Sequence, residues 1–290
     1  MVKIQTNGYD MYLDGTLKAN LDHFKYAVTQ NNMDYLFICG GAVGTGKSVF
    51  TGGTIGAYLD PTFRGQSAIN RMCQTPQEFK DEVMKAKKFQ FVNYDEAVTG
   101  TTGKRSMAKM NFTIFSMLEQ IRQKNLYIGI TLPNWFTLDA NIALDRATTL
   151  YYVYTPKDQP FSRGRFAFFN RSKKHILWYK GKRFHTMAAK LTTSANFIGR
   201  FTHQIPFDES EYQKKKLESF EAYVRSMEGT VKVPIAETHR FEIHRNSLVK
   251  VLYDSGKTQL EIAELVGKFG GQALSKSNIS LILKRTGVEG

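Results

Sequence analysis

The residues with the clearest capacity for chemistry lie in the stretch FICGGAVGTGKSVF, residues 37–50. Within it, Gly41 is followed after four residues by Gly46, Lys47 and Ser48. The backbone N–H groups of such a glycine-rich turn point inward at phosphate, and the following helix adds its dipole. An apolar strand precedes the loop and a helix is expected over residues 47–58, which is the context that this motif needs. The pattern predicts a phosphate-binding loop; the alternative is a chance glycine turn.

The loop supplies the residues that we expect to bind ATP and Mg²⁺. Lys47 would reach the β- and γ-phosphates, and the Ser48 hydroxyl would be a ligand of the metal ion. The residues expected to bind ATP are Gly41, Gly44, Thr45, Gly46, Lys47, Ser48 and Val49.

A pair of acids ends the next apolar strand, FQFVNYDE. Asp95 is expected to hold Mg²⁺, and Glu96 to polarise the attacking water as general base. Their alternative role is an exposed turn. A small-molecule kinase has little use for the second acid, and the guanine-reading Asn-Lys-x-Asp pattern is absent from the sequence. The pair therefore favours ATP hydrolysis.

Two further kinds of catalytic residue are expected. A polar residue near the γ-phosphate should come from the strand that lies between the two motif strands; YIGITLPN offers Thr131 and Asn134, and we favour Asn134. An arginine from a neighbouring subunit usually completes hydrolysis. The candidates are Arg105, Arg122 and Arg146, with Arg105 and Arg122 favoured, and a surface ion pair is the alternative for each.

The elements that must position these residues alternate along the chain. Helices are expected over residues 17–30 and 107–123. A further helix is expected to start at Thr75–Pro76, where Glu78 completes a capping box. Apolar strands are expected at 35–39, in FQFVNYDE and in LYIGITLP. Alternating strands and helices predict a parallel sheet covered by helices.

Residues 151–200 hold eleven Lys and Arg residues against one acid, Asp158. Aromatic residues are interleaved with them, which favours a nucleic-acid partner over a merely solvated surface. The runs LYYVYT, GRFAFFN and HILWYKG are expected to be strands of an antiparallel extension of the sheet edge. The residues expected to contact DNA are Arg163, Arg165, Arg171, Lys173 and Lys174.

The order of the motifs resembles the FtsK–HerA superfamily of P-loop motor ATPases, including its zonula-occludens-toxin-like and viral or plasmid members. The resemblance covers roughly residues 35–155, and LEQIRQKN followed by ITLPNWFTLD is its more specific part. It implies a RecA-like core, a hexameric ring and movement of DNA. The chain departs from the toxin-like branch by lacking a membrane segment, and from the large translocases by being short.

The last part of the chain is expected to be separately helical. Residues 241–290 read as three helices, and Thr258 and Glu261 form a capping box. The segment resembles resolvase-type and regulator-type helix-turn-helix domains, although KFGGQAL is a long turn. Its expected DNA contacts are Lys276, Ser277, Asn278, Lys284 and Arg285. A three-helix protein-interaction or oligomerisation domain is the alternative.

The sequence thus predicts an α/β ATPase domain over residues 1–205, with a basic β-rich extension over 151–200. A charged helix and linker follow over 206–235, and a helix-turn-helix domain over 236–290. The leading interpretation is an ATP-hydrolysing motor that acts on duplex DNA as a homo-oligomeric ring. The alternatives are an ATP-gated DNA-binding regulator or partition-type protein, or a helper in recombination. No run is long enough to cross a membrane, and two cysteines give no disulfide framework, so we expect a cytoplasmic protein.

Overall fold

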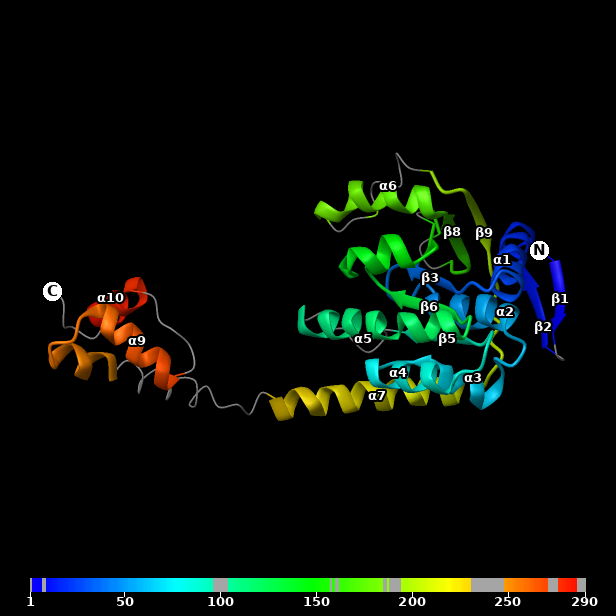
Figure 1. Cartoon of the computed structure of the whole chain (residues 1–290). Coiled ribbons are helices and arrows are strands. Elements are labelled where there is room, and N and C mark those ends of the chain that lie inside the picture. The colour runs from blue at the N-terminus through cyan, green and yellow to red at the C-terminus, as the bar shows by residue number, and fades with distance from the viewer. Residues whose placement is uncertain are drawn as a thin grey trace. The chain divides into compact units, whose positions relative to one another are not determined.

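The chain divides into two compact units, residues Met1–Tyr223 and Val224–Gly290. The computed structural model describes residues 2–6, 9–95, 104–156, 158–159, 162–184, 187, 194–230, 248–270 and 276–285 (Figure 1).

A seven-stranded sheet forms the centre of the first unit. Its spatial order is β4-β5-β6-β3-β7-β8-β9. The first five strands pair in parallel, whereas β8 pairs antiparallel with β7 and β9 pairs antiparallel with β8. Their bounds are Met72–Cys73 (β4), Phe91–Asp95 (β5), Tyr127–Leu132 (β6), Tyr35–Gly40 (β3), Thr149–Tyr154 (β7), Arg165–Phe169 (β8) and Phe197–Arg200 (β9). The parallel core, and the placement of one strand between the two motif strands, are confirmed.

Helices cover both faces of this sheet because its central strands are buried on both sides. Along β3, Leu36 and Ile38 face one apolar cluster, whereas Phe37 and Cys39 face the other. This is the two-residue alternation of a strand. The first cluster includes side chains of α4 (Pro76–Lys85), α5 (Lys104–Gln123), η3 (Asn141–Arg146) and α6 (Arg171–Gly181). The second includes side chains of α1 (Gly15–Gln30), η1 (Val49–Gly56), α2 (Ala57–Leu59), α3 (Gly65–Arg71) and α7 (Glu209–Thr230).

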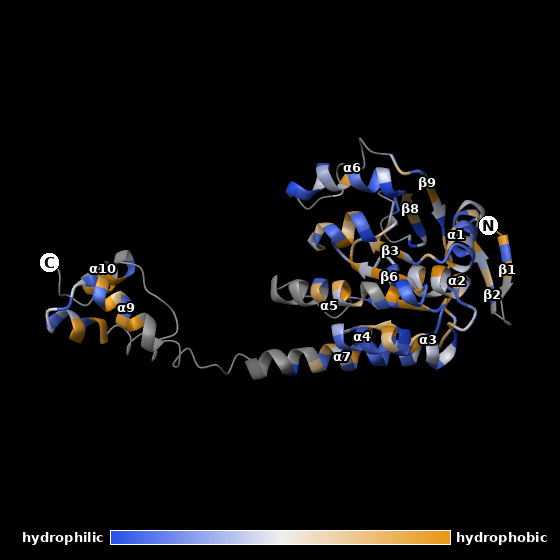
Figure 2. Cartoon of the chain, viewed as in Figure 1, coloured by the Kyte–Doolittle hydropathy of each residue, from blue (hydrophilic) through white to orange (hydrophobic). Residues whose placement is uncertain are grey.

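The helices begin where the sequence offers capping side chains. The Asp14 carboxylate accepts hydrogen bonds from the first-turn backbone of α1. The capping box of α4 is confirmed, since the Glu78 backbone N–H donates to Thr75 Oγ1 at 3.1 Å and Pro76 occupies the first turn. The outer side of α4 is largely hydrophilic (Figure 2), so the helix has one buried face, formed around Phe79 and Val83.

The prediction that HILWYKG forms a strand is wrong. The segment lies in α6, where Asn170 Oδ1 accepts a hydrogen bond from the Lys173 backbone N–H at 3.1 Å and caps the helix. Leu177 and Trp178 then pack into the first apolar cluster. A short aromatic run has no periodicity that separates a buried strand from a helix, so the cap decides the outcome.

A hairpin that was not predicted, β1 (Val2–Thr6) with β2 (Tyr9–Leu13), precedes α1. Met11 and Leu13 are buried in the second cluster. The hairpin therefore closes part of the face that α1 covers.

The helix after the glycine loop is wound as a π-helix over Val49–Gly56. Its glycines let other elements approach closely: a Cβ on Gly53 would overlap the Gln204 carbonyl, and one on Gly56 would overlap the Phe91 ring. The segment that contains Gln204 therefore packs closely against the middle of this helix.

The two tryptophans of the chain lie together beyond the end of β6. The rings of Trp135 and Trp178 are 5.1 Å apart between centroids, and both are almost fully buried. Trp135 Nε1 donates to Met187 Sδ at 3.2 Å. The ring pair joins η2 (Trp135–Thr137) to α6.

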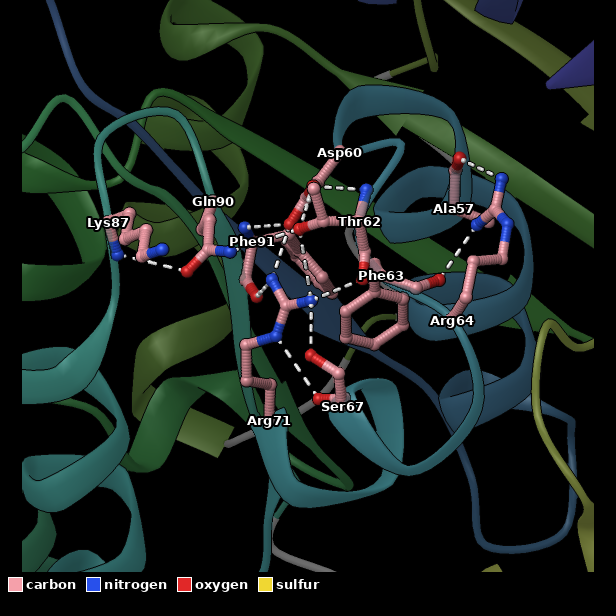
Figure 3. Close-up of polar contacts among 10 residues, drawn as sticks. All are labelled: Ala57, Asp60, Thr62, Phe63, Arg64, Ser67, Arg71, Lys87, Gln90 and Phe91. Carbon is pink, nitrogen blue, oxygen red and sulfur yellow. Dashed lines mark hydrogen bonds and ion pairs between the residues drawn. The ribbon is translucent and has the colours of Figure 1, made fainter. Parts of the chain in front are cut away.

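A buried ion pair between Asp60 and Arg71 ties the end of α2 to α3 and to the start of β5 (Figure 3). Asp60 also accepts from the backbone N–H groups of Thr62 and Phe91, at 2.7 and 2.9 Å. Arg71 donates to the Thr62 carbonyl at 2.8 Å and to Ser67 Oγ at 3.0 Å. Both charges are thus surrounded by polar partners.

We expect Arg71→Met to lower the free energy of unfolding of the first unit by about 3–5 kcal/mol, because it leaves Asp60 as a buried, uncompensated charge. The measurement is urea denaturation followed by far-ultraviolet circular dichroism. Removing both charges in Asp60→Asn/Arg71→Met should cost less than Arg71→Met alone. A loss below about 1 kcal/mol for the single variant would contradict the expectation.

Candidate functional site

The glycine-rich loop leaves the carboxyl end of β3 with a backbone that only glycine tolerates. Gly41 has φ +150° and Gly46 has φ +95°. A Cβ on Gly41 would collide with the Val153 carbonyl on the neighbouring strand β7. Glycine here is needed both for its backbone angles and for the close approach of two strands.

Lys47 and Ser48, the lysine and the serine of the motif, directly follow Gly46. Lys47 Nζ donates to the Ala42 carbonyl at 2.8 Å, across the loop. Thr45 Oγ1 donates to the same carbonyl at 2.9 Å. Ser48 opens the helix, and Thr51 Oγ1 lies 3.1 Å from the Lys47 carbonyl. The loop is therefore a closed turn with its lysine directed back over it.

Asp95, at the carboxyl end of β5, lies beside this loop although β6 separates the two motif strands in the sheet. It is buried and accepts hydrogen bonds from Tyr212 Oη at 2.6 Å and from Lys216 Nζ at 3.1 Å. The same ammonium donates to Ser48 Oγ at 3.0 Å. Burial acts to raise the pKa of Asp95, but the Lys216 charge, with hydrogen bonds from Ser48 and Tyr212, holds that pKa below its usual value. Asp95 is thus an ionised acceptor.

The Ser48 hydroxyl and the Asp95 carboxylate fit a metal ion. Both are oxygen donors of the kind that Mg²⁺ takes. The ammonium of Lys216 already lies within hydrogen-bonding distance of both, which shows that the two oxygens accommodate one cation.

A cavity of about 460 Å³ opens in front of the loop. Its walls come from the loop, the ends of β5 and β6, the residues just before β8, and a segment before and within α7. The lining residues are Val43, Gly44, Gly46, Lys47, Ser48, Val49, Asp95, Thr131, Leu132, Pro133, Arg163, Gly164, Phe201, His203, Ile205, Phe207, Glu209, Tyr212, Gln213 and Lys216.

The end of β6 brings Thr131 to this cavity. Its hydroxyl donates to Asn93 Oδ1 at 3.1 Å and lies 3.4 Å from Thr51 Oγ1. Asn134 lies beyond the lining residues Leu132 and Pro133, and its Oδ1 accepts from the Phe136 backbone N–H at 3.1 Å. Of the two residues considered for contact with the γ-phosphate, Thr131 is the one that lines the cavity.

The candidate arginines lie away from this cavity or outside the described side chains. Arg146 Nη2 donates to Asp34 Oδ2 at 3.0 Å, and Arg122 Nε lies 3.9 Å from Asp34 Oδ1. Asp34 directly precedes β3, so both arginines lie at the amino edge of the sheet, opposite the loop. Glu96 and the Arg105 side chain lie outside the described residues.

Sequence reasoning missed the wall that α7 contributes. Tyr212 and Lys216 are four residues apart and so lie on one face of the helix. The run QKKKLE in which Lys216 lies is typical of a solvated helix face, and nothing local in it distinguishes Lys216 from its neighbours. Only the fold brings Lys216 to residues that lie more than 100 positions earlier in the sequence.

The basic residues expected to contact DNA differ in their exposure. Arg165 is partly exposed, whereas Arg163 and Arg171 are exposed. Lys173 donates to the Ala195 carbonyl at 3.2 Å. Lys174 is fully buried and donates to the Leu144 and Ala147 carbonyls, at the end of η3. Burial lowers the pKa of Lys174 to about 7. Because its side chain is buried against the end of η3, Lys174 is withdrawn from the expected DNA contacts.

The second unit has a small core of its own, made by residues 248–255, α9 (Gln259–Gly270) and α10 (Lys276–Arg285). The core consists of Val249, Ile262, Val266, Ile279, Ile282 and Leu283. The capping box is confirmed, since the Glu261 carboxylate accepts from the Thr258 backbone N–H at 2.9 Å. Asn278 is exposed; the side chains of Lys276, Ser277, Lys284 and Arg285, and the turn before α10, lie outside the described residues.

Within the described parts of the chain, no helix combines the length and the apolar character needed to cross a bilayer.

The sequence and the fold can be compared with those of known proteins. No protein-family model matches the sequence, and no curated protein matches it significantly. Among solved structures, AMPPCP-bound DnaA from Aquifex aeolicus is similar with 12% sequence identity and a TM-score of 0.29, over 96% of this chain and 90% of that one. A similarity of this size assigns no function. The chain is therefore described by its own features: a mixed α/β fold whose mostly parallel sheet presents a glycine-rich loop beside a buried acid, as in the core of a P-loop ATPase.

Proposed function

We propose that the protein is a Mg²⁺-dependent ATPase that acts on DNA, as a motor of the FtsK–HerA type working in a homo-oligomeric ring. The observation that supports this most strongly is the convergence of Lys47, Ser48 and Asp95 on one cavity, with β6 lying between their two strands. A loop of this kind binds phosphates through backbone N–H groups, and the acid across from it completes a metal site.

The residues of the chain would divide the work of hydrolysis. The loop backbone and Lys47 would hold the β- and γ-phosphates, with Ser48 and Asp95 as ligands of Mg²⁺. When bound, the metal ion would supply positive charge to the phosphates. Glu96, next to Asp95, would accept the proton of the attacking water, and Thr131 or Asn134 would contact the γ-phosphate. An arginine of a neighbouring subunit, Arg105 or Arg122, would stabilise charge on the transferring group.

The basic side chains beyond β7 support DNA as the partner. Arg163, Arg165, Arg171 and Lys173 are expected to contact phosphates. The helical second unit would add contacts through Lys276, Ser277, Asn278, Lys284 and Arg285. Phosphate contacts give affinity without much sequence preference, as a motor requires.

A second candidate is an ATP-gated DNA-binding regulator with slow turnover. It is favoured by one observation: the second unit has its own apolar core and a capped helix, so it is built as a separate module. Such a module could select a DNA site while ATP sets the oligomeric state.

The deciding experiment measures ATP hydrolysis with and without duplex DNA, together with the mass in solution with ATP. A motor predicts several-fold stimulation by DNA of any sequence and an ATP-dependent ring. A regulator predicts tight binding to one sequence and slow turnover that DNA does not raise. A protein that neither binds nor hydrolyses ATP would contradict both.

Salt dependence of DNA binding tests the basic surface. In a triple variant, Arg165, Arg171 and Lys173 are each replaced by glutamine. The slope of log affinity against log salt concentration should fall by roughly one for each phosphate that these side chains neutralise in the wild type. A matched control replaces Lys80, Lys85 and Lys88, which are exposed on or just after α4. Equal slopes for the two triple variants would remove this surface from the proposal.

A further inference from the structure

Three consecutive lysines of α7 have three different surroundings. Lys214 is exposed. Lys215 Nζ donates to the Ile69 and Met72 carbonyls, both at 2.9 Å, and lies 3.1 Å from Glu78. Lys216 Nζ contacts Ser48 Oγ and Asp95 Oδ2 at 3.0 and 3.1 Å. Successive residues of a helix are about 100° apart around its axis, so one charged run can serve three purposes.

The placement of Lys216 is fixed by its neighbours on the same helix. Asp208 Oδ1 accepts from the Glu211 backbone N–H at 2.9 Å, near the start of α7. Tyr212, one turn before Lys216, donates to the same Asp95 carboxylate. The Lys216 ammonium also lies over the Tyr212 ring, 4.6 Å from its centroid.

The contacts of Lys216 are the ones that a metal ion would need. Mg²⁺ binds oxygen ligands at about 2.0–2.1 Å and demands a near-octahedral arrangement. An ammonium 3.0 Å from the same Ser48 oxygen and 3.1 Å from Asp95 leaves no room for that arrangement and would repel the ion. The two cations exclude each other at these oxygens.

We infer that the Lys216 ammonium and the metal ion of the bound nucleotide compete for Ser48 and Asp95, and that binding of the metal–nucleotide complex moves Lys216 away and loosens α7. This inference rests on the proposed nucleotide site. Lys216 thereby makes α7 responsive to the metal. Lys215 donates to backbone carbonyls of α3 and β4 and so keeps α7 attached to these two elements.

The test titrates Mg²⁺ at a fixed concentration of ADP and measures ADP binding by calorimetry, starting from buffer with EDTA. In Lys216→Met the Mg²⁺ concentration for half-maximal binding should fall roughly tenfold, the size of a typical coupling between two sites. Lys216→Arg keeps a competing cation and should stay close to the wild type.

The neighbouring lysines supply the matched controls. Lys214→Met should leave the Mg²⁺ midpoint unchanged. Lys215→Met should weaken the attachment of α7 but should also leave the Mg²⁺ midpoint unchanged. An unchanged midpoint in Lys216→Met, or an equal shift in Lys215→Met, overturns the inference.

A second readout follows α7 directly. In the wild type, amide hydrogen exchange between Tyr212 and Tyr223 should be faster with Mg²⁺ and ADP than with ADP and EDTA. In Lys216→Met this difference should largely disappear. Exchange that Mg²⁺ and ADP leave unchanged in the wild type overturns the inference.

The Lys47→Ala variant separates the two levels of proposal. If the wild type binds ADP, Lys47→Ala does not, and Lys216→Met behaves as the wild type, the nucleotide site stands and the competition fails. If the wild type binds no ADP, the proposed function fails and the competition fails with it.

Discussion

Replacing Lys47 with alanine is expected to reduce ATP hydrolysis by at least about 100-fold, the effect of removing one group that stabilises charge in a transition state. Lys47 Nζ now donates to the Ala42 carbonyl, within its own loop. From that position a rotation of the flexible side chain would bring the ammonium to phosphates that the proposed site holds on the same loop. The measurement is release of phosphate at saturating ATP.

The Lys47 variant should stay folded, which makes the activity loss interpretable. The hydrogen bond to Ala42 spans a surface loop, and its removal should cost no more than about 1 kcal/mol of unfolding free energy. Lys214→Ala, which removes an exposed charge from the same domain, is the matched control and should hydrolyse ATP as the wild type does. Full activity in Lys47→Ala would exclude this loop as the catalytic site.

Replacing Glu96 with glutamine should abolish turnover while leaving ATP binding intact. A carboxamide fills the same space but cannot accept a proton from water, and general-base catalysis typically contributes about 10²–10⁴-fold. Because Asp95 would still bind the metal ion, the variant should hold ATP and keep the assembled form. The measurements are the rate of ATP hydrolysis and the mass of the protein assembly in solution in the presence of ATP.

Glu218→Gln is the control for Glu96→Gln, since Glu218 is exposed on α7. It should behave as the wild type in both assays. If Glu96→Gln hydrolyses ATP at a near-normal rate, another group activates the water. If it loses ATP binding as well, the acid contributes to binding instead of to proton transfer.

Most of the sheet was predictable because its strands have strong local signals, but β4 and β9 were not predicted. The segment LYYVYT, expected in an antiparallel extension, forms β7 and pairs in parallel with β3. β3, β5 and β6 are fully buried apolar runs that end in glycine, in acids or in a proline-containing turn. The weaker elements were not found. The Asn7-Gly8 pair between two alternating segments is typical of a hairpin, but each segment is only five residues long. In α6 the aromatic residues resemble a strand until the Asn170 cap is taken into account.

The site was predictable only where its residues lie near the motifs. Lys47 and Ser48 end the loop that follows β3, and Asp95 is the last residue of β5, so the strand order alone brings them together. Tyr212 and Lys216 reach the same acid from a helix over 100 positions later in the sequence. No spacing rule connects them to the loop. The buried Lys174 shows the reverse error, because a basic run gives no sign of which member turns inward.

The pairing of Trp135 with Trp178 has a practical consequence for every solution study of this chain. These are its only tryptophans, and their rings touch, so tryptophan fluorescence reports from a single place. That place lies just past Leu132 and Pro133, which line the cavity. Emission should respond to ligands in the cavity and to unfolding of the first unit. Events confined to the second unit will be silent, which makes tryptophan emission a selective optical probe of the first unit.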